Sequence, residues 1–248
     1  MQERLPGIIL SWLTENQNDI FPSISSWHKL LDDRFSNLQI SNPGAQAMIQ
    51  IFLDKCGIVN IKENFPPRDI NSFIAFLCDI DNSIYRKFAI IYFLIDEFVN
   101  ITQTRTIEDV YDFANLIRVS TNQVQFILGC IDLDSIVNEP DLLLPRLTVS
   151  SLPHSLEFPI LTLLLSDPKL YPFAFMFYVN KKPTVEKDLI DHHYLIIKTL
   201  VLNSRLYESL LHIRTIRNEE SVKECLQFLF DFSLNNKKET ELFNTVLT

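Results

Sequence analysis

The chain has little glycine, with only 4 residues in 248 against 12 prolines and 19 phenylalanines. Glycine supplies positive backbone φ angles and allows close backbone approach, so its scarcity disfavours tight β-hairpins, phosphate-cradling loops and Rossmann turns. Apolar residues make up 47% of the sequence, which is enough for a sizeable core and argues against intrinsic disorder. Low glycine with abundant apolar residues favours helices.

Blocks of basic residues are also absent, and the formal net charge is −9. Such a surface repels a phosphate backbone, so a primary nucleic-acid binder is disfavoured. The longest uncharged apolar runs, 88–95 and 170–179, are much shorter than the roughly 20 residues that a helix needs to cross a bilayer. The first residues, MQERLPGIILSWL, carry an acid and lack a small-residue cleavage site. We therefore expect neither a transmembrane segment nor a secretory signal.

Paired cysteines are missing as well. The four cysteines are more than twenty residues apart, and each lies in an apolar segment: Cys56, Cys78, Cys130 and Cys225. This spacing suits neither a zinc knuckle nor a small disulfide framework. It predicts reduced thiols in the core of an intracellular protein.

Catalytic motifs are missing too: the chain has no Gly-x-Ser-x-Gly, Walker loop or His-Glu-x-x-His. Asp191, His192 and His193 form the most enzyme-like cluster. Adjacent side chains on a helix point about 100° apart, so the two histidines need a third ligand from elsewhere to hold one metal. Glu208 and His212 share a helix face but lack the second motif of a di-iron bundle. We predict no catalytic, cofactor-binding or metal-binding residue, with an all-α enzyme around the 191–193 cluster as an alternative.

What the sequence does contain is helical periodicity. Apolar residues recur at steps of three and four on one stripe of an early helix, namely Trp27, Leu30, Leu31, Phe35 and Leu38. Asp32 and Asp33 lie on the other side of that helix, where we expect a solvated face.

Capping residues mark several helix ends. Asn42 as an N-cap, with Pro43 in the first turn, predicts a helix that ends before Gly57. Thr106 and Asp109 form a capping box at the start of another helix. The segment 84–101 is apolar almost all round in its centre, which predicts a central helix buried between two layers.

These patterns predict an all-α fold of roughly ten to thirteen helices with no sheet. Short helices joined by short polar turns indicate an irregular, solenoid-like stack of helical pairs, without a fixed repeat length. Residues 138–153 contain three prolines and no clean helical period, which predicts a connector. We expect the run Leu142 to Leu144 within this connector to be buried. The connector divides one helical domain, 1–248, into an amino-terminal half, 1–137, and a carboxy-terminal half, 154–248.

The aromatic segment 173–178, FAFMFY, allows two interpretations. It is either core on every side or part of a partner-binding groove, since aromatic residues and methionine are enriched at protein interfaces. Its candidate interface residues are Phe173, Phe177 and Tyr178.

Three segments of the carboxy-terminal half resemble the helical domain of the ELYS nucleoporin family, including its short fungal members. They are LPHSLEFPILTLLL at 152–165, YVNKKP at 178–183 and LVLNSRLYESLLHIRTIR at 200–217. In the family a turn like the second segment precedes a long helix, and a helix like that of the third segment follows. The match covers about 100 residues, and the amino-terminal part agrees only in helical character.

The resemblance implies a structural component of the nuclear pore complex at the nuclear envelope. Such a component binds protein subunits of the Y-shaped scaffold and supports protein and mRNA transport without catalysis. The strand-rich propeller and the basic tail with AT-hooks of large animal members are missing, so we expect no direct DNA binding. Arg205, Arg214 and Arg217 are further candidates for the partner interface. A helical adaptor of another assembly, such as a vesicle coat or a proteasome lid, is the alternative.

Overall fold

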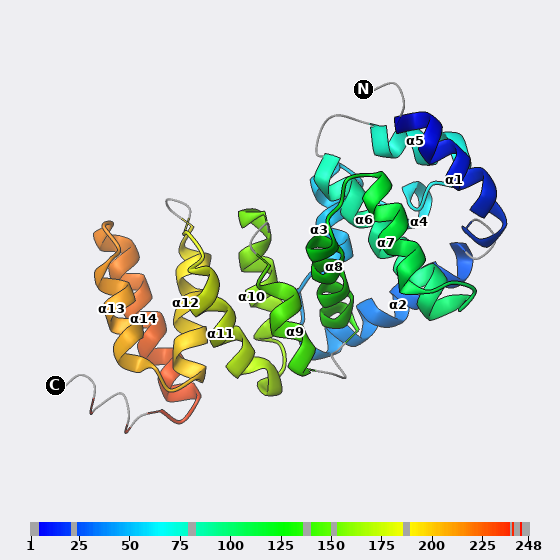
Figure 1. The fold of residues 1–248 in the computed structure, drawn as a ribbon. Helices are drawn as coiled ribbons and strands as arrows, with labels where there is room; N and C mark the ends of the chain where they lie inside the picture. The colour runs from blue at the N-terminus through cyan, green and yellow to red at the C-terminus, as the bar shows by residue number, and fades with distance from the viewer. Residues whose placement is uncertain are drawn as a thin grey trace. The chain divides into compact units, whose positions relative to one another are not determined.

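A computed structural model describes residues 5–20, 24–78, 83–135, 140–149, 153–185 and 189–238, together with residues 240 and 244. This described part contains fourteen α-helices and no strand (Figure 1), so the predicted all-α class is confirmed. None of its helices combines the length and the apolar character that crossing a membrane requires.

The chain divides into two compact units, Met1–Ser151 and Leu152–Thr248. The boundary falls inside the connector that the sequence predicts at 138–153. Half of that connector is helical rather than irregular, because residues Pro140–Leu147 form a helix, α9. The prolines of this segment made a helix unexpected from the sequence. Pro140 occupies the first position of α9, where an amide is not needed, and Pro145 removes one internal hydrogen bond. Of the three leucines expected to be buried here, Leu143 is buried but Leu142 is 45% exposed.

The first unit contains nine further elements before α9. They are α1 (Leu5–Ile20), α2 (Ile24–Ser41), α3 (Met48–Lys55), α4 (Ile61–Asn64), α5 (Ile70–Cys78), α6 (Ser83–Ile95), the π-helix η2 (Asp96–Ile101), α7 (Ile107–Leu116) and α8 (Thr121–Asp134). The helices of this unit gather around α6, which packs against α3, α5, α7 and α8.

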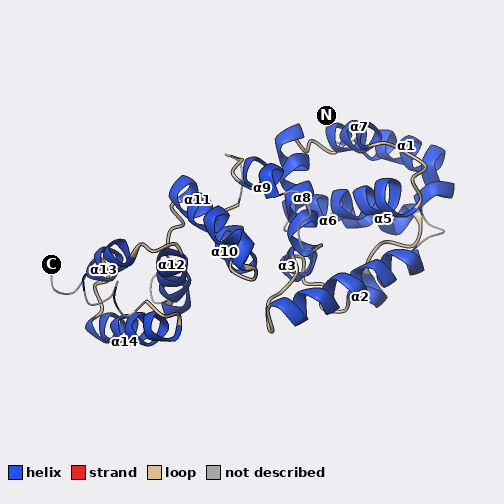
Figure 2. Ribbon diagram, turned by 90° about the horizontal axis from the view of Figure 1, so that it is seen from below, coloured by secondary structure: helices blue, strands red, loops and turns tan. Residues whose placement is uncertain are grey.

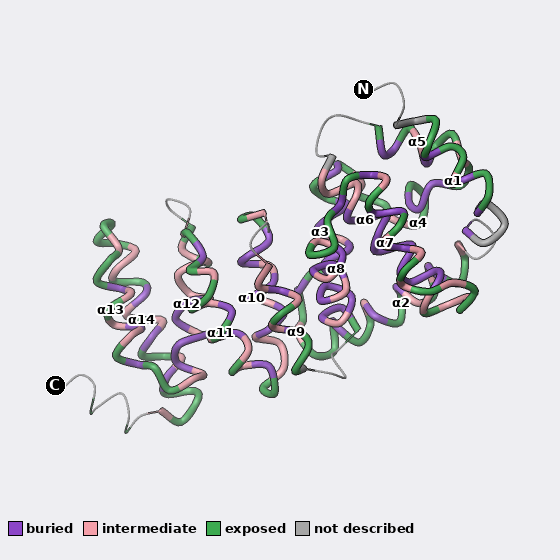
Figure 3. Tube along the Cα trace, viewed as in Figure 1, coloured by how far each residue is buried: buried purple, intermediate pink, exposed green. Residues whose placement is uncertain are grey.

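The central helix expected within 84–101 is present. All side chains of 88–95 are buried, with exposed fractions of 0 to 1%, because neighbours cover α6 from several sides. Figure 3 shows the buried colour along α6 and α8. The last six residues of the predicted segment form the π-helix η2, a wider turn that places Asp96 and Glu97 in the interior. Apolar periodicity gives no signal for such a turn, which often marks a special site.

Three of the five residues of the stripe predicted on α2 are buried, while Leu30 and Phe35 are half-buried, and one unexpected residue is buried with them. Trp27, Leu31 and Leu38 are buried, and Asp32 and Asp33 are exposed as predicted. Arg34 is also buried, at 7% exposed. A charge on the apolar face of a helix requires a buried partner.

Helix ends agree with the sequence in two cases out of three. Gly57 has a φ of 76° and its amide bonds to Asp54, as expected after the end of α3. The capping box of Thr106 and Asp109 is formed at the start of α7. The predicted start at Asn42 is wrong, because α3 begins at Met48. Its first amides bond to a side chain 86 residues away rather than to a local cap.

The second unit contains η3 (His154–Leu156), α10 (Glu157–Leu164), η4 (Pro168–Leu170), α11 (Tyr171–Lys181), α12 (Ile190–Leu202), α13 (Leu206–Arg214) and α14 (Glu219–Asn235). Each α-helix packs against the next in the chain, and α12 also contacts α14. Figure 2 shows α12, α13 and α14 grouped around a shared interior. Six buried side chains fill it: Ile197, Val201, Leu206, Ile213, Cys225 and Leu229.

Candidate functional site

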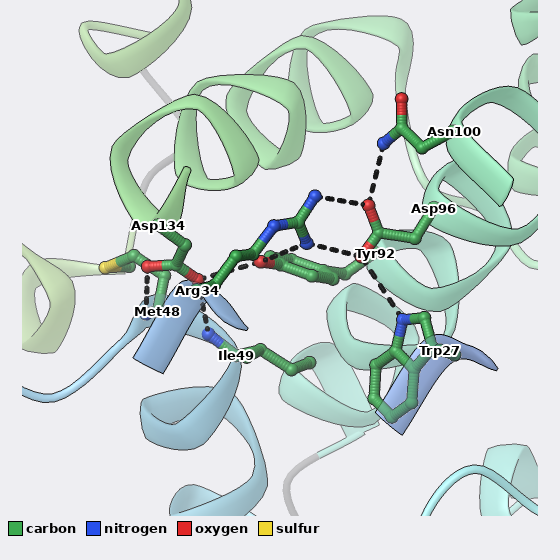
Figure 4. Close-up of polar contacts among 8 residues, drawn as sticks. All are labelled: Trp27, Arg34, Met48, Ile49, Tyr92, Asp96, Asn100 and Asp134. Carbon is green, nitrogen blue, oxygen red and sulfur yellow. Dashed lines mark hydrogen bonds and ion pairs between the residues drawn. The ribbon is translucent and has the colours of Figure 1, made fainter. Parts of the chain in front are cut away.

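The strongest concentration of polar chemistry is a cluster inside the first unit (Figure 4), which we call the buried polar cluster. Its members come from α2, α6, η2 and α8: Trp27, Arg34, Tyr92, Asp96, Asn100 and Asp134. Arg34 donates two hydrogen bonds to the carboxylate of Asp96, across 2.6 and 2.8 Å. Trp27 and Asn100 donate to the same carboxylate, across 3.2 and 2.8 Å. Four donor contacts therefore satisfy one buried carboxylate.

Tyr92 joins this ion pair to a second carboxylate. Its hydroxyl accepts a hydrogen bond from Arg34 across 3.1 Å and donates one to Asp134 across 2.9 Å. Asp134 in turn accepts from the backbone amides of Met48 and Ile49, across 2.7 and 3.3 Å. The last residue of α8 thus caps the first turn of α3, whose orphan amides and positive dipole end favour a carboxylate.

Burial dominates the electrostatics here. It raises the pKa of Asp134 to about 6 despite the three hydrogen bonds that favour the charged form. It raises the pKa of Glu97, next to Asp96, to about 7, and the charge of Asp96 adds to the effect. Burial alone would lower the pKa of Arg34, but its interactions with Tyr92, Asp96 and Asp134 outweigh burial and raise that pKa. The guanidinium is therefore permanently charged, while two of the carboxyl groups titrate near neutral pH.

The centre of this cluster is buried, although Asn100 at its edge is exposed. Tyr92, Asp96 and Asp134 are 0% exposed, and Arg34 is the most exposed of the four at 7%. Its chemistry therefore joins helices and fixes their register. The sequence signal that could have found it is Arg34 itself, which lies three residues after Leu31 and four before Leu38 on the apolar stripe of α2.

The second unit brings together two histidines that we did not predict to be neighbours. His193 of α12 and His212 of α13 are hydrogen-bonded, with 3.0 Å between Nδ1 and Nε2. Burial lowers the pKa of His212 to about 4, with a further contribution from His193. Burial, followed by the charge of His192, also lowers the pKa of His193. Both imidazoles are neutral at pH 7.

The predicted cluster of Asp191, His192 and His193 does not converge. His192 stacks on Phe158, with ring centroids 3.5 Å apart, and Asp191 is exposed. Across the described residues, no group of three or more His, Cys, Asp and Glu side chains is arranged to hold a metal ion. Of the four cysteines, Cys78 is exposed and is therefore not the core thiol that we predicted.

A pocket of about 330 Å³ adjoins His212 of this pair. Its walls come from α11, the turn after it, α12 and α13, and consist of Tyr178, Val179, Lys182, Pro183, Ile196 and His212. Lys182 ends α11 in the left-handed conformation, with a φ of 47°, and so turns the chain toward Pro183. The YVNKKP segment therefore forms one side of this pocket.

The candidate interface residues of the aromatic segment occupy different environments. Phe177 is fully buried, so it belongs to the core and is unavailable to a partner. Phe173 and Tyr178 are half-buried. Two neighbours that sequence reasoning did not select, Met176 and Val179, are 45% and 44% exposed. The most exposed of these apolar side chains on α11 are therefore Met176 and Val179 and not the phenylalanines.

The three candidate arginines also differ. The guanidinium of Arg205 lies over the ring of Phe175, at 5.3 Å from its centroid, and pairs with Glu208 across 3.5 Å. Arg214 and Arg217 are exposed, and neither forms an ion pair within the described residues. The last two are free to contact a partner, whereas Arg205 already joins α13 to α11.

Sequence reasoning missed the exposed apolar side chains of α13 and α14. Tyr207 and Leu211, one turn apart on α13, are 56% and 40% exposed. Phe230 and Leu234, one turn apart on α14, are 37% and 48% exposed. Lys238 donates to the hydroxyl of Ser204 across 2.6 Å, which places the end of α14 beside the start of α13. The two exposed pairs therefore lie at a similar level along the packed helices.

Comparison of the sequence with protein-family models and with curated proteins found no match in either case.

Proposed function

We propose that the chain is a structural component of the nuclear pore complex that binds protein subunits of the Y-shaped scaffold through its helices, without catalysis. The partner is inferred from the resemblance of 152–165, 178–183 and 200–217 to the ELYS family. Protein binding itself is carried by one observation, the exposed apolar side chains of the second unit.

Those side chains repeat at one-turn spacing on two packed helices. Tyr207 and Leu211 on α13, and Phe230 and Leu234 on α14, are each more than one third exposed. Single exposed apolar residues are ordinary, but grouped ones mark interaction surfaces, and tyrosine and phenylalanine are enriched at the centre of interfaces. We call these four residues the α13–α14 apolar group.

Polar residues of the resembling segments join the helices of this unit. Asn203 donates to the carbonyl oxygens of Tyr171 and Thr199, across 2.9 and 2.8 Å, and so links the end of α12 to the start of α11. Ser209, where the family has a small residue, is fully buried in α13. The Asn203 contacts support the proposal because they give a matching polar position a structural role in the helical array.

The test is localisation and affinity purification of the fluorescently tagged protein. We expect a nuclear rim in interphase and recovery of pore scaffold subunits. Combined Tyr207→Asp and Leu211→Asp should abolish both, because a buried carboxylate in the interface is costly. Ile40→Asp, at an 81% exposed apolar residue of the first unit, is the matched control and should change neither.

Two outcomes would overturn the proposal. One is a diffuse cytoplasmic signal without a rim. The other is recovery of vesicle-coat or proteasome-lid subunits without pore scaffold proteins, which would assign the same apolar group to another assembly.

A further inference from the structure

His193 and His212 face each other from neighbouring helices, and their geometry resembles that of two ligands of one ion. Their facing nitrogens, Nδ1 and Nε2, are 3.0 Å apart, and their ring centroids are 5.1 Å apart with the planes tilted by 47°. Two imidazole nitrogens bound to one tetrahedral zinc ion at about 2.0–2.1 Å lie about 3.3 Å from each other. The observed separation is within a few tenths of an ångström of that value.

We propose that His193 Nδ1 and His212 Nε2 form a binding site for a divalent first-row transition-metal ion such as Zn²⁺. Neutral imidazole is a ligand that such ions prefer. The sequence did not indicate this site, because His193 finds its partner 19 residues away on α13 and not in the adjacent His192.

Ion binding replaces the hydrogen bond between the rings. In the neutral pair, one facing nitrogen carries the shared proton and the other carries a lone pair. The proton-bearing ring must shift its proton to its other nitrogen, as imidazole tautomers allow, so that both facing lone pairs turn to the ion. No net proton is released, and no oxidant or reductant takes part.

The pocket beside His212 supplies room for the remaining ligands. His212 is part of the wall of this cavity of about 330 Å³, so water molecules there can complete a four-coordinate ion. Lys182 lines the same pocket, and its exposed ammonium repels a cation through screened charge. With two protein ligands and this nearby charge, we expect an exchangeable ion rather than a permanent structural one.

The test is isothermal titration calorimetry of Zn²⁺ into the full chain at pH 7.5, with Mg²⁺ as the comparison because it prefers oxygen ligands. We expect one Zn²⁺ per chain and no heat with Mg²⁺. His212→Gln keeps a hydrogen-bonding side chain but removes the ligand, so Zn²⁺ affinity should fall at least tenfold. His154→Gln, at a histidine whose side chain is 88% exposed, is the matched control and should bind as the unaltered chain does.

A second variant separates a lost ligand from a lost fold. His212→Cys removes the imidazole but provides a thiolate, which is a zinc ligand, so binding should return. Absence of Zn²⁺ binding by the unaltered chain would overturn the proposal. Equal affinity in the unaltered chain and in both His193→Gln and His212→Gln would also overturn it, because the ion would then lie elsewhere.

Discussion

The guanidinium of Arg34 and the carboxylate of Asp96 form a two-pronged ion pair, 2.6 and 2.8 Å long, between side chains 62 residues apart. The pair is buried and shares hydrogen bonds with Trp27, Tyr92 and Asn100. Replacing a whole buried ion pair by apolar residues is often neutral, whereas removing one partner leaves an uncompensated charge in the interior. The consequences of single changes here are therefore large.

Arg34→Met should destabilise the first unit by roughly 3–5 kcal/mol, because Asp96 is then buried without its cation. Urea unfolding followed by tryptophan fluorescence measures this unit alone, since the two tryptophans of the chain, Trp12 and Trp27, both lie in it. Lys62→Met breaks an exposed ion pair with Asp32, 2.8 Å long, and is the control. It should cost less than about 1 kcal/mol. Equal effects of the two changes would contradict this assignment.

The first unit should become more stable as the pH falls from 7.5 to 5.5. Folding raises the pKa of Glu97 to about 7 and that of Asp134 to about 6, above their ordinary values. The folded state therefore binds more protons in this range, so the free energy of unfolding decreases as pH rises. The two carboxyls together account for about 2–3 kcal/mol.

Glu97→Gln tests this pH dependence. In this variant the gain in unfolding free energy from pH 7.5 to 5.5 should fall to about 1 kcal/mol, which is the part due to Asp134. The readout must be tryptophan fluorescence, which reports on the first unit. The lowered pKa of His212 makes the second unit less stable as the pH falls, which is the opposite pH dependence. Fluorescence-monitored stability that is flat or falls toward pH 5.5 in the unaltered chain would count against the raised carboxyl pKa values.

Phe177→Ala should destabilise the second unit by roughly 3–5 kcal/mol, because it leaves a cavity where a fully buried ring stood. Met176→Ala is the adjacent control on the same helix, and since Met176 is 45% exposed its cost should be below about 1 kcal/mol. Thermal unfolding monitored by circular dichroism gives both values. A small effect of Phe177→Ala would return this residue to the candidate interface.

Gly129→Ala should destabilise the first unit, although alanine is normally favoured over glycine inside a helix by about 1 kcal/mol. A Cβ at Gly129 of α8 lies 2.9 Å from the Cβ of Arg146 and 3.1 Å from Leu147 Cδ2, so α9 must move. We expect a net loss of roughly 1–2 kcal/mol. Gly7→Ala in α1, where no atom lies within 4 Å of the added Cβ, is the control. Its midpoint in urea should stay constant or rise.

Combined Arg214→Glu and Arg217→Glu should weaken recovery of pore scaffold subunits while the circular dichroism spectrum stays unchanged. Both side chains are exposed, and neither has an ion-pair partner within the described part of the chain. Arg205→Glu should in addition lower the melting temperature, because it loses the contact with Phe175 and repels Glu208. Full recovery with the double variant would remove these two arginines from the interface.

Local patterns in the sequence were enough to predict most of the helices, α9 excepted, and several of their ends. The stripe of Trp27, Leu31 and Leu38, the capping box at Thr106 and the left-handed Gly57 each depend on residues within one or two turns of one another. The same reasoning failed where the partner is distant in sequence. Asn42 is a good local cap, but Asp134 supplies the cap of α3 from 86 residues away.

The candidate sites needed the structure for the same reason. Periodicity placed Arg34 on an apolar stripe but could not supply Asp96 as its partner, and His193 meets His212 only because α12 packs against α13. Aromatic density at 173–178 could not separate the buried Phe177 from the exposed Met176 beside it. Exposure on a helix with apolar residues on several sides is decided by tertiary packing and not by composition.

The cap that Asp134 supplies to α3 has a kinetic meaning. An isolated helix of eight residues is too short to persist in water. The first two backbone amides of α3 donate to the carboxylate of Asp134, the last residue of α8. We therefore expect opening of α8 to destabilise α3, so that the two helices unfold as one cooperative unit. Their amide protons should exchange with solvent at a common rate, although 65 residues separate the end of α3 from the start of α8 in the chain.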